Sequence, residues 1–393
     1  MKRCLILLTA LILVVLALPI TALGGDRSEE EVTAFTMDDA MKAVDFNALE
    51  QYKDNIDGEI DDYLQGKTVK EWFIAFIKGE WHFNLGDIIQ GILRYLFGEV
   101  TANYGLLGKI LILSVISALL LNLQNSFSSS VTGVSYLACF LALSAIALGS
   151  FKVVLDIGHH TIDNMVTFMM AILPQMLVLS AGMGNINSSA MLFPLLGTAA
   201  TAFATAIKNV VFPLIILSAM LHLINNMSTS LKVEKMAKFF TQIAQMSLAF
   251  FLTIFVGVLT LRALYASVLD KVALRTTKFV TDNAIPLVGK MFSDTIEVAA
   301  GYMVMLKQAL GIYGALIVFL TVLYPLLKIV AIALIYKVSA AIAEPLGDSR
   351  TAAVLEIMST HLFLMLASVA AVALMFFIMI AIVIGMSNGM AAI

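Results

Sequence analysis

The sequence has few cysteines and little charge. Two cysteines occur in 393 residues, Cys4 and Cys139. Cys4 falls in a predicted leader, so no intramolecular disulfide or cysteine-based metal site is expected. Charged residues make up 13% of the chain and hydrophobic residues 60%, whereas a soluble domain has about 25% and about 45–50%. This composition excludes an ordinary soluble enzyme, and 24 basic against 27 acidic side chains give no basic surface for nucleic acid.

Catalytic and nucleotide-binding motifs are also missing from the sequence. We find no phosphate-binding loop and no Ser-His-Asp set, the patterns that mark nucleotide hydrolysis and acyl transfer. We therefore expect no enzymatic activity, no catalytic residues and no cofactor. Any transport would be driven by a partner or by a gradient.

Residues 1–24 have the features of a secretory signal peptide. Lys2 and Arg3 precede an uncharged apolar stretch, and a small-x-small site follows at Ala22-Leu23-Gly24, which is the usual order of such a leader. The alternative is an uncleaved anchor helix. Under either interpretation the segment that follows is carried across the membrane.

Residues 25–103 form a predicted acidic, extracytoplasmic domain. From residue 25 to 99 the chain has 17 acidic and 7 basic side chains, whereas from residue 100 onward it has 10 acidic and 15 basic. Apolar residues recur every three to five positions between residues 44 and 64, which predicts short amphipathic helices. We expect a small helical cap on the membrane domain or, alternatively, a docking surface for a partner.

Residues 104–393 form a predicted transmembrane domain. One crossing needs about 20 mostly apolar residues, and the windows nearly free of charge predict about eight spans. Polar residues at 124–130 and at 182–189 divide the two longest windows. The fold class is therefore an all-α, polytopic integral membrane helical bundle. The windows are 110–151 and 164–207 with two spans each, and 209–231, 239–261, 308–336 and 357–393 with one each.

The basic loops predict the orientation of these spans. If residue 25 lies outside, the loops at 232–238 and 337–350 both fall inside, as the positive-inside rule requires. Residues 262–307 then fall outside although they hold six basic and four acidic side chains, which fits the rule poorly.

Within that misfit segment, polar or helix-breaking residues recur every four positions. At helical spacing the charged residues would share one face, and the proline would break the helix. The segment could be a re-entrant element that lines a wet cavity or an amphipathic helix that lies on the outer surface. The residues concerned are Lys278, Asp282, Pro286, Lys290 and Asp294.

A weak internal repeat points to a second such element. A shift of 112 residues places Pro174 on Pro286 and Pro213 on Pro325. The repeats would be parallel and cover 164–264 and 276–385. Paired proline-broken segments in matching units are typical of a transport path, so Pro174 becomes a candidate lining residue.

Four ionisable residues within the predicted spans are candidate intramembrane polar sites, because buried charge is costly there. They are Lys328, Glu356, His361 and His222. A Lys328–Glu356 pair is one interpretation, and His222 would form a hydrogen bond between helices.

A further set of potential metal ligands, Asp156, His159, His160 and Asp163, has helical spacing. These residues lie in a predicted water-facing loop between two spans, where such side chains are solvated. We therefore expect no metal site.

Three short segments resemble the stage III sporulation protein AE family of endospore-forming bacteria. They are Ala284 to Lys290, Gly311-Ile312-Tyr313-Gly314 and Ala343-Glu344-Pro345-Leu346. The resemblance implies a mother-cell membrane protein in a complex that bridges mother cell and forespore. It implies as partners sibling sporulation membrane proteins of the same operon, a secretion-type ATPase and a forespore membrane protein. It also implies support of late forespore gene expression.

Two functions from different classes follow from these observations. The first is a membrane component of a sporulation channel or secretion-like complex. The alternative is a stand-alone permease for a small solute, which would move solute without partners.

Overall fold

The computed structural model describes residues 41–42, 44–54, 68–78, 85–127, 130–183, 185–227, 232–284 and 289–385. All regular elements in these ranges are helices, and none of these residues forms a strand. The predicted all-α fold is therefore confirmed. The predicted signal peptide, residues 1–24, and much of the acidic segment lie outside the described residues.

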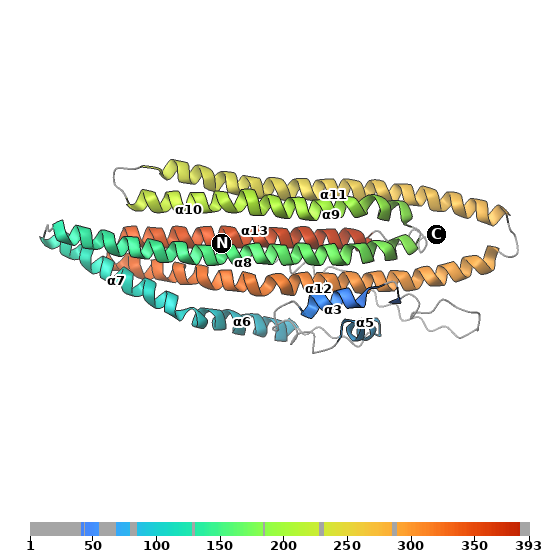
Figure 1. Ribbon diagram of the computed structural model, residues 1–393, viewed down its shortest axis with the longest axis horizontal. Helices are drawn as coiled ribbons and strands as arrows, with labels where there is room; N and C mark the ends of the chain where they lie inside the picture. The colour runs from blue at the N-terminus through green and yellow to red at the C-terminus, as the bar shows by residue number, and fades with distance from the viewer. Residues whose placement is uncertain are drawn as a thin grey trace.

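Short helices precede a bundle of long ones (Figure 1). The short helices are α3 (Phe46–Asp54), α5 (Val69–Ile77) and α6 (Leu85–Ala102). The long helices lie side by side with their axes close to the long axis of the molecule. They are α7 (Tyr104–Phe127), α8 (Ser130–Gly182), α9 (Ile186–Ala206), α10 (Phe212–Met227), α11 (Glu234–Ala284), α12 (Gly289–Ala343) and α13 (Ser349–Gly385). A π-helix, η1 (Ile207–Val211), joins α9 to α10, and a 3-10 helix, η2 (Glu344–Leu346), lies between α12 and α13.

Six helical segments in the described residues are long and apolar enough to cross a membrane, where we predicted about eight spans. They are Tyr104–Leu123, Val134–Gly182, Ser189–Met227, Glu234–Arg262, Ala299–Leu346 and Ser349–Gly385. The predicted loop around residues 152–163 is wrong, because α8 is continuous there. The predicted boundary near residue 208 is also wrong, because η1 carries the chain from α9 into α10.

The predicted helix breaks that the structure confirms differ in residue type from the predicted loop that it contradicts. The breaks at 124–130 and 182–189 are confirmed by the ends of α7, α8 and α9, and both stretches are rich in Ser, Asn and Gln or Gly. Such residues hydrogen-bond to their own backbone and favour helix ends. The residues around Asp156 carry charge but no proline, and charge alone leaves a helix intact. At 1.5 Å per residue, the 53 residues of α8 extend about 80 Å.

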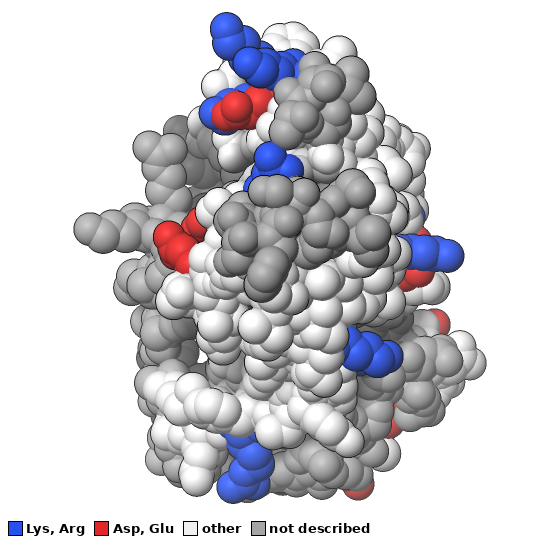
Figure 2. Space-filling model, turned by 90° about the vertical axis from the view of Figure 1, so that its left-hand side faces the viewer, with Lys and Arg blue, Asp and Glu red and all other residues white. Residues whose placement is uncertain are grey.

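Both basic turns lie at the same end of the bundle. The α10–α11 and α12–α13 connections are on the left in Figure 1, whereas the ends of α8 and α11 are on the right. This arrangement agrees with the prediction that the two loops share one side, whereas their cytoplasmic location stays a prediction. Figure 2 shows this left-hand end, where Lys and Arg lie in separate places around a surface with little charge.

The core of the bundle is built around α13. This helix packs most extensively against α12 and also contacts α8, α10 and α11. Its interior positions, among them Phe376 and Met379, are fully or almost fully buried, as is Tyr336 of α12. By contrast α11 buries only 17% of its most apolar window, against 61% for α13. α13 is therefore a central helix and α11 a peripheral one.

The short helix α5 docks onto α12 through aromatic rings. Trp72 and Phe73 are buried, and their ring centroids lie 5.4 and 5.7 Å from that of Tyr313. Phe46 of α3 meets Phe73 edge-on at 5.4 Å. Aromatic rings bury large areas, so these contacts fix the short helices to the bundle.

Candidate functional site

Several ionisable side chains of the bundle form pairs between helices. Lys328 Nζ of α12 lies 3.9 Å from Glu99 Oε1 of α6. Lys208 of η1 forms an ion pair with Asp163 of α8. Charge inside a bilayer is costly unless a partner or water stabilises it, so these pairs are the first candidates for functional positions.

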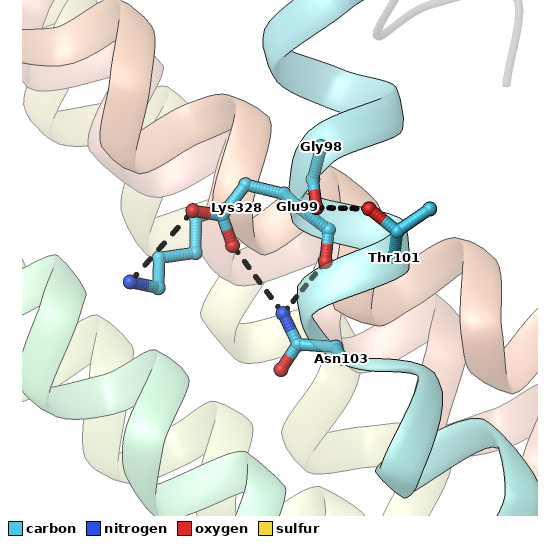
Figure 3. Close-up of polar contacts among 5 residues, drawn as sticks. All are labelled: Gly98, Glu99, Thr101, Asn103 and Lys328. Carbon is cyan, nitrogen blue, oxygen red and sulfur yellow. Dashed lines mark hydrogen bonds and ion pairs between the residues drawn. The ribbon is translucent and has the colours of Figure 1, made fainter.

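Glu99 is held at the junction of α6 and α7 (Figure 3). Asn103 Nδ2 donates to Glu99 Oε2 at 3.3 Å and to the Glu99 carbonyl at 2.8 Å. The Glu99 side chain is 14% exposed, whereas that of Lys328 is 44% exposed. One turn away, Tyr95 meets Tyr324 edge-on at 4.7 Å. Together these contacts fix α6 against the middle of α12.

The predicted Lys328–Glu356 pair is wrong. Glu356 of α13 pairs with Lys337 of α12 instead, and Lys328 faces Glu99 of α6. The register between two antiparallel helices decides which side chains meet, and a single sequence does not contain that register.

His361 of α13 lies in a buried polar contact that joins three helices. Its Nε2 lies 3.0 Å from Ser218 Oγ of α10. Ser218 Oγ donates to the carbonyl of Ala237 at 2.8 Å and contacts Thr241 Oγ1, both in α11. The ring of His222 meets that of His361 edge-on, with centroids 5.4 Å apart. The interhelical hydrogen bond that we predicted for His222 is thus formed by His361.

The potential metal ligands of α8 form other contacts. Asp163 pairs with Lys208, and the His159 ring stacks on Phe212 at a centroid distance of 5.2 Å. Gly158 lies under the same ring, since a Cβ there would be 3.0 Å from Phe212. Within the described residues, no three His, Cys, Asp or Glu side chains gather as a metal would need. The π-helix that begins at Ile207 widens the backbone at this contact, as π-bulges often do at functional sites.

Asp348 is a buried carboxylate that the sequence analysis missed. It is fully buried and accepts hydrogen bonds from Ser117 Oγ of α7 at 2.6 Å and from Tyr136 OH of α8 at 3.2 Å. It also accepts the Thr351 N–H at 3.0 Å and the Thr351 hydroxyl. Gly347, with φ +90°, turns the chain into this position. Asp348 is therefore the N-cap of α13 and joins three helices.

Lys307 is a second functional candidate that the sequence analysis missed. The residue, in α12, is fully buried, and its Nζ lies 3.4 Å from Ser180 Oγ of α8. Among the described residues, this one long contact to a hydroxyl compensates poorly for the hydration that the ammonium group has lost. A position of this kind is a functional candidate by default in a membrane protein.

The segment with regular charge spacing forms the ends of two helices. Lys278 and Asp282 belong to α11, and Lys290 and Asp294 belong to α12, but the side chains of all four lie outside the described part of the chain. Pro286 also lies outside it, between the end of α11 and the start of α12. These helix ends project beyond the α8–α9 turn (Figure 1). Their pore-lining role stays a prediction.

The proposed equivalence of Pro174 and Pro286 stays a prediction, because Pro286 lies outside the described residues. α8 continues through Pro174, whereas α11 ends at Ala284, before Pro286. Membrane helices tolerate proline because neighbouring groups satisfy the freed backbone positions. Pro174 lies instead at the edge of a groove between α8 and α9.

Comparison with known protein families identifies the family of this chain. The family model described as stage III sporulation protein AE matches residues 67–387. The chain belongs to the stage III sporulation protein AE family. A relative of that name from Bacillus subtilis (strain 168) is 35% identical over 326 residues, which are 83% of this chain and 82% of the relative. No solved structure matches the chain.

The structure gives a physical role to the stage III sporulation protein AE segments that carried the resemblance. A Cβ at Gly314 would lie 2.6 Å from Ile172 Cδ1 of α8, and one at Gly311 would overlap Ile384 of α13. These two glycines therefore allow α8 and α13 to approach α12 closely. Tyr313, between them, receives α5. The Glu344–Leu346 segment is η2, directly before the cap residue Asp348.

Replacement of Lys307 is expected to have opposite effects on stability and on function in this member of the stage III sporulation protein AE family. We expect Lys307→Met to raise the free energy of unfolding in detergent by about 1–3 kcal/mol, because the substitution removes a desolvated charge that has one weak partner in the described part of the chain. We also expect the variant to lower sporulation efficiency. Lys238→Met, at a lysine 63% exposed, is the matched control and should change stability by less than about 0.5 kcal/mol. A loss of stability in Lys307→Met would show that Lys307 is structural.

Proposed function

We propose that this protein is a membrane component of a sporulation channel or secretion-like complex that joins the mother cell and the forespore. In this proposal it lies in the mother-cell membrane around the forespore, with residues 25–103 outside the cytoplasm. It supports late forespore gene expression and spore development. Membership of the sporulation family and the six long apolar helices support this role.

The proposed partners are sibling stage III sporulation membrane proteins of the same operon, a secretion-type ATPase and a forespore membrane protein. The proposed role is not enzymatic. Energy for transport would come from the ATPase partner or from a gradient.

The observation that carries the proposal is the packed interior of the bundle. Tyr336 of α12 and Phe376 of α13 are among its largest fully buried side chains, so bulky aromatic rings occupy the interior of the bundle. Protein interiors packed in this way contain few voids larger than a water molecule, so they leave no path for a solute. A conduit is therefore better built between this chain and others than inside it.

The alternative, a stand-alone permease, is favoured by one observation. The buried Lys307 ammonium could attract an anionic solute into the bundle. A permease of this kind would have to open the interface between α8 and α12, where Lys307 meets Ser180.

Purification and reconstitution distinguish the two functions. A channel component should co-purify from sporulating cells with its sibling proteins and the ATPase, and it should move no small anion when reconstituted alone. A permease should accumulate radiolabelled small anions in liposomes without partners, and Lys307→Met should abolish that flux. Flux by the isolated protein together with no recovered partners would overturn the proposed function.

A further inference from the structure

A buried lysine and the start of a helix meet at one serine. Ser180, in the last turn of α8, is fully buried, and its Oγ lies 3.4 Å from Lys307 Nζ. The Ser180 carbonyl accepts the N–H groups of Met183 at 3.3 Å and of Asn185 at 3.2 Å, and Asn185 directly precedes α9. Lys307 and the amino end of α9 therefore belong to one junction, at the end of the bundle opposite the basic turns (Figure 1).

The face of α12 that carries Lys307 is turned toward this junction. Met303 lies one turn before Lys307, so the two side chains share a face. A Cβ at Gly182, the last residue of α8, would lie 3.7 Å from Met303 Cε. Gly182 is exposed, and Ile186 at the start of α9 is 63% exposed. The junction is therefore open to the surroundings on the side of the α8–α9 turn.

The amino end of α9 has hydrogen-bond donors that its own helix does not use. The Ser189 N–H donates to the Asn185 carbonyl at 3.0 Å, so the N–H groups of residues 186–188 have no partner within the helix. The Asn185 side chain forms no capping hydrogen bond, and the first turn holds no acidic residue. The Ser189 hydroxyl is buried and, within the described ranges, has no hydrogen-bond partner. Helix ends of this kind carry partial positive charge and bind anions.

The chain supplies no carboxylate for this positive charge. No Asp or Glu occurs in residues 164–207 or 298–343, which include the α8–α9 turn and Lys307. The ion pairs of the described residues do not involve Lys307. The carboxyl end of α8 favours a cation, but its Ser180 carbonyl already accepts two N–H groups. An ammonium group and unused N–H donors at one junction therefore favour an anion as ligand.

We propose that the α8–α9 junction binds a phosphate group. The N–H groups of residues 186–188 and the Ser189 hydroxyl would donate to its oxygens, and Lys307 on its flexible stem would pair with its charge. Several acceptor oxygens on one anion suit several donors. Inorganic phosphate and the phosphate of a phospholipid headgroup share this chemistry. The site goes beyond the proposed function, because binding needs neither a partner protein nor transport.

Thermal unfolding of the purified full chain in an uncharged detergent tests the site, because a ligand that binds only the folded state raises the unfolding temperature. We expect a rise of about 3 °C or more with at least one of two saturating ligands. Sodium phosphate is compared with sodium chloride at equal ionic strength, and dioleoyl phosphatidylglycerol with dioleoylglycerol, which lacks the phosphate. A rise with the phospholipid alone identifies a lipid headgroup as the ligand, and a rise with sodium phosphate identifies the free anion.

Two variants locate the bound phosphate, each compared with its own unfolding temperature without ligand. Lys307→Met removes the ammonium group, and Asn185→Asp places a carboxylate at the amino end of α9, where it caps the helix and repels phosphate. Both should reduce the rise at least threefold. Lys238→Met, at a lysine 63% exposed, is the matched control and should keep the full rise.

No rise with either ligand in the wild-type protein would overturn the proposal. So would an undiminished rise in Lys307→Met or in Asn185→Asp, because phosphate would then bind elsewhere on the protein.

Discussion

Asp348→Ala should destabilise the protein by about 3–5 kcal/mol. The substitution removes the N-cap of α13, which is typically worth about 1 kcal/mol. It also removes the acceptor for the buried hydroxyls of Ser117, Tyr136 and Thr351. Each hydrogen bond to a charged group contributes about 1.5–3 kcal/mol, and a buried donor left without an acceptor adds a further penalty. Because the three hydroxyls belong to α7, α8 and α13, the loss should separate these helices at one end of the bundle.

Unfolding of the purified protein by denaturing detergent measures this effect. Asp348→Asn keeps the shape and the capping oxygen but loses the charge, so its loss of stability should be intermediate. Glu344→Ala, at an exposed carboxylate four residues away, is the control and should be close to wild type. If Asp348→Ala unfolded at the same detergent concentration as Glu344→Ala, the carboxylate would not join the helices as described.

Gly314→Leu should have an effect of similar size through overpacking. The Cβ alone would approach Ile172 Cδ1 to 2.6 Å, and Ile172 is fully buried. The added side chain must displace the buried Ile172 side chain or push α8 away from α12, and insertion of this volume into a packed core costs about 3 kcal/mol. We expect the variant to accumulate poorly in the membrane and to block sporulation.

Gly301→Leu is the matched substitution for this prediction, on the same helix. A Cβ at Gly301 has no neighbour within 4 Å, and leucine favours helix by nearly 1 kcal/mol relative to glycine. The control should therefore be as stable as the wild type or more so. Equal stability of the two variants in thermal unfolding would show that the Gly311–Gly314 motif is not a packing motif.

Much of the fold could be predicted from long apolar windows that are nearly free of charge and from polar residues that end helices. The ends of α7 and α8 fall within polar stretches where the sequence predicted them. The predicted loop at Asp156 was wrong because it was placed on charge. A charged residue within a helix can find a partner on another helix, as Asp163 does with Lys208. A charged residue in such a sequence is therefore a better indication of an ion pair between helices than of a helix end.

The interhelical contacts could be predicted less well than the helices. Lys328 was singled out, but its partner Glu99 is 229 residues away in sequence and depends on how α6 docks. Lys307 was missed because the predicted spans were chosen to be nearly free of charge. The window 308–336 therefore begins directly after this lysine. Asp348 could have been found, since Gly-Asp before an apolar helix is a capping pattern.

Labelling of single cysteines in intact, non-sporulating cells that express the protein tests the central claim most directly, namely that this is a membrane bundle whose α10–α11 and α12–α13 turns share one side. In a background with Cys4→Ser and Cys139→Ser, Lys232→Cys and Glu344→Cys occupy these exposed turns, and Ile186→Cys occupies the exposed start of α9 at the other end. A membrane-impermeant maleimide should label Ile186→Cys in intact cells, and it should label the other two only after permeabilisation. Labelling of Lys232→Cys and Glu344→Cys from opposite sides would contradict this account.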